Sequence, residues 1–431
     1  MMYLMLISYI VVIGFLYRIS FGPYKNLGLF HLFYLSYIIC ILLALPTLNN
    51  GEKYYEIYVK AALLTPLFFL VGGVVGKVRF FPLINKKENY QYFDYFLKNR
   101  TNKILILLIF FFIIYLLDVG VNSSGLLFAL SNPGDSIAAM EIRMKALTSN
   151  ISIMLTRLYG YSRAFIIPFL CCLFLVYRLE KIISRKRMYF IFILALFYCA
   201  FSAAKAPVFY LILAMALTYY WWNLYENPKL AHIYSLKFSG GILAGLFVAS
   251  LFYPLLHGVD NSEAISYAWD QLNERVFEVP SSVAMRYFEV FGRSVDFLGW
   301  DSNSLLSLVS SEEKISSAQL LYAHFYSNMF SDSGLMNGAF FAMMYAGFGF
   351  YSMVLGTIFC GFIVGQVQIF LNTMPVNGIS LSCRAVCSLA VMQLILTDFT
   401  SILMGRGMLL LPFLLCVFTY IICYFKIKSH L

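Results

Sequence analysis

Long uninterrupted apolar runs constrain the fold of this chain more than any other feature. Eleven of them approach or exceed the roughly 20 apolar residues that a helix needs to cross a bilayer. They cover residues 2–17, 28–46, 57–76, 103–119, 158–177, 188–204, 207–222, 238–256, 337–371, 382–400 and 407–425. Because a backbone in lipid must satisfy its own hydrogen bonds, these runs are expected to be helices. The sequence therefore predicts an all-α, polytopic transmembrane helical bundle of about 11 spans.

The composition excludes most other classes of protein. Apolar residues make up 61% of the chain and charged residues 12%, whereas soluble domains carry about 25% charge. This excludes a soluble enzyme, a DNA-binding module and a secreted domain. The net charge of +10 includes no basic stripe on a polar face, so nucleic acid is not an expected partner. All nine cysteines lie in apolar runs, which indicates neither a disulfide framework nor a zinc site.

The basic residues predict the orientation of the spans. Loops 77–103 and 178–187 are rich in Lys and Arg and are expected on the cytoplasmic side. If successive loops alternate between the two sides of the membrane, nineteen of the 31 basic residues lie on the cytoplasmic side. Two long loops, 120–157 and 257–336, then lie on the outer side. We therefore expect three parts, namely spans 1–8 with the loop 120–157 over 1–256, a large helical outer loop over 257–336, and spans 9–11 over 337–431.

The run 337–371 is too long for one straight span. We expect a short interfacial segment, then a break near Gly347 and Gly349, and then the true crossing. The spacing of Gly361 and Gly365 is typical of close helix packing.

The other twelve basic residues lie on the outer side or within spans, whereas the positive-inside rule predicts that Lys and Arg are concentrated in cytoplasmic loops. Seven of the twelve are arginines. Arginine keeps its charge and binds phosphate through two parallel hydrogen bonds. Both outer loops are therefore candidate anion sites. The alternative is that each arginine pairs with a nearby carboxylate or with lipid phosphate.

The segment 274–293 is the most informative part of the large outer loop. Pro280 is placed to open a helix. Val283, Tyr287, Val290 and Phe291 form an apolar stripe at helical spacing that could lie on the bilayer. Arg286, Glu289 and Arg293 share another face, where they could form a surface ladder of ion pairs. The functional alternative is that Arg275 and Arg286 face a membrane-anchored diphosphate.

Three further residues outside this segment are candidates for chemistry. His324 and Asp332 lie near the end of the large outer loop, and either could accept a proton. Lys205 occupies a short outward turn before Pro207. Its ammonium group either reaches the membrane interface or lines the mouth of a cavity. Each of the three also has a purely structural interpretation.

Familiar nucleotide, metalloprotease and hydrolase motifs are absent from the sequence. No cytoplasmic segment is long enough for a nucleotide-binding domain. A reaction would therefore need an activated substrate that is already in the membrane. We also expect no metal and no cofactor, with arginine supplying the positive charge.

Three segments carry a resemblance to a known family. They are Ala203-Ala-Lys205-Ala-Pro207, Arg275-Val-Phe-Glu-Val-Pro280 followed by Arg286-Tyr-Phe, and Ser327-Asn-Met-Phe-x-Asp332-x-Gly334 followed by Tyr345-Ala-Gly-Phe-Gly349. In these segments the chain resembles the O-antigen polymerases of the Wzy type. The resemblance implies a fold related to the GT-C type of lipid-linked-sugar glycosyltransferase. It implies a multi-pass protein of the bacterial inner membrane, with an active site facing the periplasm.

The resemblance also implies the substrates, which would be two undecaprenyl-diphosphate-linked oligosaccharides, one the donor and one the acceptor. A chain-length regulator and a flippase are implied partners besides the bilayer. For catalysis we consider His324, Asp332 and Glu289 as alternative bases. Positive charge for the departing diphosphate would come from Arg275 and Arg286, assisted by Arg143, Arg157, Arg163 or Lys205. An O-antigen ligase and a non-enzymatic flippase for lipid-linked oligosaccharides are the alternatives.

Overall fold

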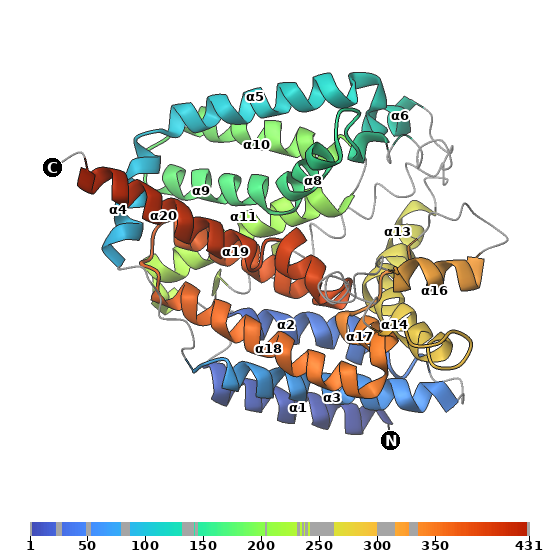
Figure 1. Cartoon of the computed structure of the whole chain (residues 1–431). Coiled ribbons are helices and arrows are strands. Elements are labelled where there is room, and N and C mark those ends of the chain that lie inside the picture. The colour runs from blue at the N-terminus through green and yellow to red at the C-terminus, as the bar shows by residue number, and fades with distance from the viewer. Residues whose placement is uncertain are drawn as a thin grey trace. The chain divides into compact units, whose positions relative to one another are not determined.

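The computed structural model describes residues 2–22, 28–48, 53–78, 87–131, 142, 145–202, 205–230, 233–234, 237, 240–241, 263–299, 315–326 and 335–428. Helices form every regular element in these ranges (Figure 1). The described residues also contain one isolated β-bridge, between Phe291 and Val295. The all-α prediction is thus confirmed for the described part of the chain.

The chain forms two compact units. The first unit comprises 1–82, 272–369 and 390–404, and the second comprises 83–271, 370–389 and 405–431. Helices of the first unit are α1 (Met2–Phe21), α2 (Leu29–Tyr37), α3 (Lys53–Val75), α14 (Val279–Val290), α16 (Ser317–Tyr326), α17 (Phe340–Phe348) and most of α18 (Phe350–Thr373). The three parts expected from the sequence, with boundaries at residues 256 and 336, separate membrane spans from an outer loop, and these boundaries stay predictions.

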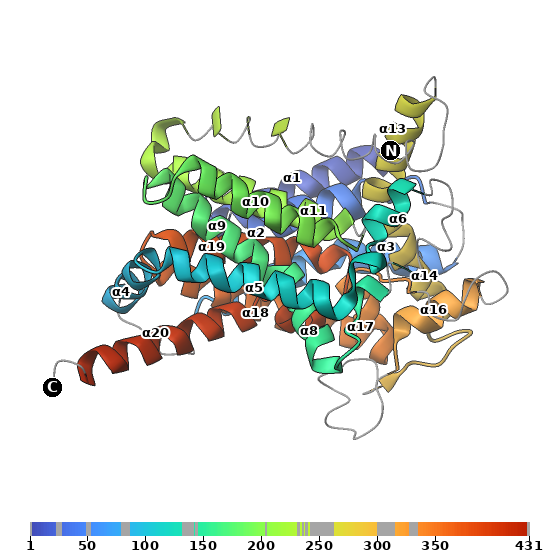
Figure 2. The same ribbon diagram turned by 90° about the horizontal axis from the view of Figure 1, so that it is seen from above.

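The second unit contains the other helices. They are α4 (Lys87–Lys98), α5 (Thr101–Val119), α6 (Gly125–Ser131), α8 (Ile153–Tyr161), α9 (Ile167–Leu179), α10 (Arg185–Ala200), α11 (Lys205–Glu226), most of α13 (Ala264–Asn273), most of α19 (Gly378–Met392) and α20 (Leu410–Lys428). A π-helical turn, Ser162–Ile166, joins α8 to α9. Helices α9, α10 and α11 pack against one another (Figure 2).

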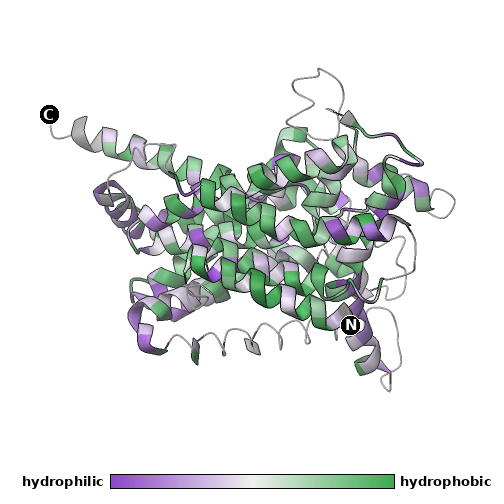
Figure 3. Cartoon of the chain, turned by 90° about the horizontal axis from the view of Figure 1, so that it is seen from below, coloured by the Kyte–Doolittle hydropathy of each residue, from purple (hydrophilic) through white to green (hydrophobic). Residues whose placement is uncertain are grey.

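Six helical stretches in the described part of the chain are long and apolar enough to cross a membrane. They are Tyr3–Phe21, Tyr54–Val75, Thr101–Val119, Ile153–Leu179, Phe350–Thr373 and Gly378–Ile395. Two shorter apolar stretches, Leu29–Leu42 and Leu410–Tyr424, accompany them. The long helices are predominantly hydrophobic along their length (Figure 3). The transmembrane character is confirmed, whereas the count of about 11 spans stays a prediction. Most of the expected span 238–256 lies outside the described residues.

The expected break in the run 337–371 is present. Helix α17 ends at Phe348, and α18 begins at Phe350. Gly349 joins them with φ of 77°, a conformation that glycine adopts without steric cost. The Ser352 hydroxyl donates to the Gly349 carbonyl oxygen over 2.9 Å, which helps to fix the junction.

Close approach of two candidate spans, α3 and α18, depends on glycine. A Cβ on Gly361 would clash with the backbone carbonyl of Phe69. A Cβ on Gly365 would lie 3.0 Å from the carbonyl oxygen of Gly73. Small residues let two membrane helices approach to backbone distance. The packing role predicted for Gly361 and Gly365 is therefore confirmed.

One prediction about helix α14 is right and one is wrong. The helix begins at Val279 with Pro280 in its first turn, as the sequence indicates. Its stripe, however, does not lie on a bilayer, because Tyr287, Val290 and Phe291 are all 0% exposed. They pack within the first unit, where helix α14 contacts α3 and α17. The aromatic ring of Phe288 stacks on Tyr345 with centroids 4.2 Å apart.

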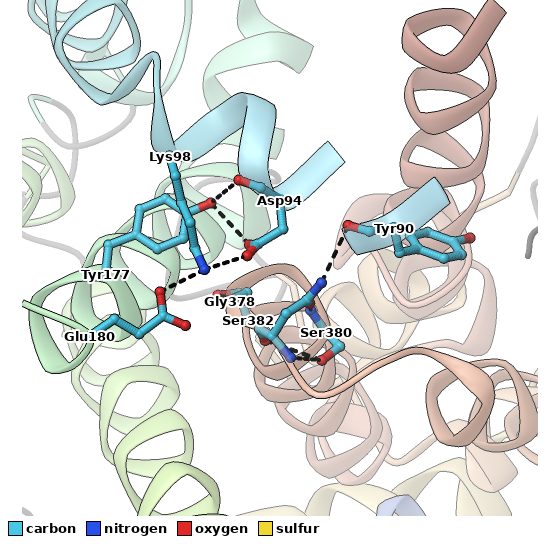
Figure 4. A network of polar contacts seen from close by, with 9 residues as sticks. Tyr90, Asp94, Lys98, Tyr177, Glu180, Gly378, Ser380 and Ser382 are labelled. Carbon is cyan, nitrogen blue, oxygen red and sulfur yellow. Dashed lines mark hydrogen bonds and ion pairs between the residues drawn. The ribbon is translucent and has the colours of Figure 1, made fainter. Parts of the chain in front are cut away.

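An ion-pair network in the second unit fixes α4. Lys98 Nζ lies 2.8 Å from Asp94 Oδ2 and 2.7 Å from Glu180 Oε2 (Figure 4). The Tyr177 hydroxyl donates to Asp94 Oδ1 over 3.1 Å. Because Asp94 is only 3% exposed, these contacts replace the water that its carboxylate loses. The network joins α4 to the end of α9.

Candidate functional site

Helix α14 carries Arg286 and is anchored through its first turn. The hydroxyls of Ser281 and Tyr58 share a hydrogen bond inside the first unit. The Ser281 hydroxyl also lies 3.3 Å from the Ile41 carbonyl oxygen, to which it can donate. Both side chains are 0% exposed, so the bond cannot be replaced by water. The start of α14 is therefore held against α3 and the π-helical turn Ile38–Leu42 that follows α2.

Arg286 lies against the end of α16. Its guanidinium carbon stands 4.5 Å from the centre of the Phe325 ring, within the range of a cation–π interaction. One terminal nitrogen, Nη1, donates to the Tyr326 hydroxyl over 3.3 Å. That bond uses one of the five N–H donors of the side chain. The half-buried guanidinium is thus oriented by an aromatic pair and by no carboxylate among the described residues.

The segment that contains Asp332 has both flanks packed against α14. On the N-terminal side Tyr326 contacts Arg286. On the C-terminal side the Tyr287 hydroxyl donates to the Met336 carbonyl oxygen over 2.9 Å. Burial raises the pKa of Tyr287, which keeps this hydroxyl protonated as a donor. Asp332 itself lies outside the described residues.

The other predicted residues of the first unit are accessible. Arg275 is exposed on the π-helical turn Glu274–Glu278 that precedes α14. His324 is exposed on α16, one residue before Phe325, and Glu289 is half-buried on α14. The expected ladder of Arg286, Glu289 and Arg293 forms no ion pair. Throughout the described ranges the two ion pairs present both belong to Lys98, so these arginines are not neutralised by a described carboxylate.

Arg163 is a buried cation of the second unit. It is 4% exposed, and its Nη2 donates to the Ala146 carbonyl oxygen over 3.2 Å. Its guanidinium carbon lies 5.4 Å from the centre of the Tyr115 ring and 5.6 Å from that of Tyr198. As with Arg286, aromatic side chains surround the charge, and here a backbone carbonyl also contacts it. Arg157 is exposed on α8.

Residues 145–150, at the end of the first outer loop, are fixed from two sides. Arg163 holds Ala146 as described. Asp118 accepts from the Ser149 hydroxyl over 2.6 Å, from the Asn150 backbone N–H over 3.0 Å and from the Tyr159 hydroxyl over 2.8 Å. These three bonds occupy both oxygens of Asp118 and give it a structural role.

The structure does not describe the side chains of the last two predicted cations, Arg143 and Lys205. Arg143 lies outside the described residues. Lys205 is the first residue of α11, so it begins the helix and does not lie in the short turn before Pro207 that the sequence predicts. Its side chain lies outside the described part. Pro207 is accordingly the third residue of that helix, where it leaves no intrahelical bond unmade.

Sequence reasoning missed the residues that orient Arg286. Phe325 and Tyr326 flank His324, and nothing in their local pattern distinguishes them from other aromatic residues of the loop. The role of Ser281 is not predicted from the sequence either, although a hydroxyl in the first turn of a buried helix is a signal for a side-chain hydrogen bond.

Among the described residues, no group of three or more His, Cys, Asp and Glu side chains could hold a metal ion. The expected metal-free chemistry nevertheless stays a prediction. Comparisons of the chain with protein-family models, with curated proteins and with solved structures find no match. The resemblance of the three sequence segments to O-antigen polymerases therefore stays a prediction.

Proposed function

We propose that this chain is a membrane glycosyltransferase of the O-antigen polymerase type. It would join undecaprenyl-diphosphate-linked oligosaccharide repeat units at the periplasmic face of the bacterial inner membrane. The observation that carries the proposal is the state of Arg286, a half-buried cation held by Phe325 and Tyr326 without a described carboxylate partner. Such a guanidinium keeps its charge and most of its donors for an anionic ligand.

The chemistry follows from this arrangement. A hydroxyl oxygen of the acceptor sugar attacks the anomeric carbon of the donor and forms the new glycosidic bond. The bond from that carbon to the diphosphate oxygen breaks, and the diphosphate leaves with the electron pair. Arg286 stabilises the negative charge that develops on it, assisted by Arg275. The hydroxyl proton passes to His324, Asp332 or Glu289. A single displacement of this kind inverts the anomeric centre.

The contacts with Phe325 and Tyr326 strengthen and orient the charge of Arg286. Stacking on Phe325 removes water from one face of the guanidinium, and an ion pair is stronger where water is excluded. The planar fork also fixes the direction of the remaining N–H groups. A lysine at the same position would keep the charge but lose both the stacking and the fork.

The proposal is tested by complementation of cells that lack the polymerase. We expect Arg286→Ala to abolish long O-chains and Arg286→Lys to reduce them about 100- to 1,000-fold, the usual effect of one lost transition-state donor. Arg275→Ala tests the assisting cation. Arg187→Lys is the matched control, because Arg187 is exposed and donates to Asn102. Protein levels in the membrane are measured in parallel.

The electrophoretic pattern separates the candidate activities. Loss of a polymerase leaves a single repeat on the lipopolysaccharide core, whereas loss of a ligase leaves the core alone. Normal long chains from Arg286→Ala would refute the role of Arg286. Core without any repeat would favour the ligase instead.

A further inference from the structure

A groove opens beside the helix break at Gly349 in the first unit. It has a volume of about 460 Å³ and is lined by α3, by Phe297, and by the junction of α17 and α18. The lining residues are Ile57, Lys60, Phe297, Tyr345, Phe348, Gly349, Phe350 and Tyr351. Every one of them except Lys60 and Gly349 is apolar or aromatic. The motif Tyr345–Gly349 has no chemical role in the proposed transfer reaction.

The break itself shapes the groove. The positive φ of Gly349 turns the chain between the two helices, and a Cβ there would lie 3.1 Å from the Phe297 ring. Phe297 also meets Tyr345 edge to face, with centroids 5.5 Å apart. The far side stays open, since Tyr351 is 84% exposed and Phe348 is 42% exposed. The result is an aromatic groove with an open side.

One cation, Lys60, lines the groove, and a second, Arg293, lies near its lining residue Tyr345. Lys60 is an exposed residue of α3 and part of the lining. The guanidinium carbon of Arg293 lies 5.6 Å from the centre of the Tyr54 ring and interacts electrostatically with the hydroxyl of Tyr345. Neither cation forms an ion pair within the described part of the chain. Lysine, arginine and tyrosine beside apolar surface are typical of the membrane interface.

The occupant follows from this combination. Because α3 and α18 are candidate membrane spans, the open side of the groove would face lipid. An apolar channel with one cation in its lining and a second nearby is complementary to a chain with a negatively charged head. Its volume falls in the range of sites for small molecules, about 300–1,000 Å³, which suits one acyl chain better than the much longer polyprenyl chain of a lipid-linked sugar.

We propose that this groove is a binding site for an anionic phospholipid, with one acyl chain against Phe297, Phe348 and Tyr351. The phosphate would lie between Lys60 and Arg293. The site is distinct from the proposed diphosphate site at Arg286, and it does not depend on the transferase activity. It gives the Tyr345–Gly349 motif a function, which is to shape a lipid groove at the end of a span.

Native mass spectrometry of the full-length protein tests this site. The purified chain is exchanged into micelles that contain equal amounts of phosphatidylglycerol and phosphatidylcholine, and retained lipid is counted. We expect the wild type to retain phosphatidylglycerol selectively. The double variant Lys60→Gln, Arg293→Gln should bind it about 30-fold more weakly, from about 1 kcal/mol for each cation.

Two controls separate a specific site from altered folding. Lys60→Arg keeps the charge and should retain the lipid. Arg18→Gln removes an exposed cation of the same unit at the end of α1 and should bind as the wild type does. Equal retention by the double variant would overturn the proposal, as would equal retention of phosphatidylcholine. Preference for undecaprenyl phosphate over phosphatidylglycerol in a competition would reassign the groove to the lipid-linked substrate.

Discussion

At the scale of single residues, the surroundings of each cation determine what it can do. Arg163 is buried among aromatic rings and a backbone carbonyl, and Arg286 is half-buried against Phe325 and Tyr326. In such surroundings a charge acts more strongly than in water. Arg275 is exposed, so solvent screens it more strongly. We therefore expect Arg286 to contribute more than Arg275 to the binding of a diphosphate.

Lys98 illustrates the opposite case, a cation that is fully neutralised. It sits between Asp94 and Glu180 and is 24% exposed. Burial lowers the pKa of Lys98, but hydrogen bonds and charges from the two acids outweigh that effect and raise it overall. A raised pKa means that the stabilisation is complete below the unfolded value of about 10.4. It is lost as the pH rises through the folded value.

Replacing Lys98 tests this network. Lys98→Met leaves the buried carboxylate of Asp94 with the Tyr177 hydroxyl as its remaining described side-chain partner from another helix. We expect a loss of about 1–3 kcal/mol in the free energy of unfolding, measured by thermal unfolding in detergent. The loss should be constant from pH 6 to 9. Lys103→Met, at an exposed position of α5, is the control, and equal stability of the two variants would argue against the network.

At the scale of elements, glycine decides how closely two spans pack. The backbones of α3 and α18 meet at Gly361 and Gly365, where a side chain would collide with backbone atoms. Backbone cannot move aside as a flexible side chain can. The small size of Gly361 and Gly365 therefore allows these two helices to approach this closely.

A pair of alanine substitutions tests this packing. Gly361→Ala should destabilise the protein by about 1–3 kcal/mol through overpacking. Gly160→Ala is the matched control, because Gly160 also lies in a helix but has nothing within 4 Å of an added Cβ. That change should be neutral or slightly stabilising, since alanine favours a helix. Thermal unfolding of both variants gives the comparison, and a larger loss from Gly160→Ala would contradict it.

At the scale of the whole molecule, the sequence predicts the helical class and the membrane character because apolar runs alone carry both. It also predicts the break at Gly349, since the glycines interrupt a run that is too long for one span. It does not predict the burial of Tyr287, because an apolar stripe suits a lipid surface and a protein surface equally well. Nor does it predict the partner of Arg286, since Tyr326 lies 40 residues further along the chain.

The orientation of the spans is a further prediction at this scale. A single cysteine introduced at Gln91, exposed on α4, should react with a membrane-impermeant maleimide only after the cells are opened. One introduced at Glu263, in the large outer loop, should react in intact cells. The native protein serves as the background, since six of its nine cysteines are buried. The reverse labelling pattern would invert the topology and place the candidate site inside.

The most direct test of the central claim is reconstitution of the reaction. The purified chain in lipid vesicles is given an undecaprenyl-diphosphate-linked repeat unit, with EDTA present, and the products are separated by length. The proposal predicts a ladder of polymers attached to undecaprenyl diphosphate, abolished by Arg286→Ala and retained by Arg187→Lys. Substrate that remains a single repeat unit with the wild-type protein, while the same preparation is folded and inserted, would contradict it.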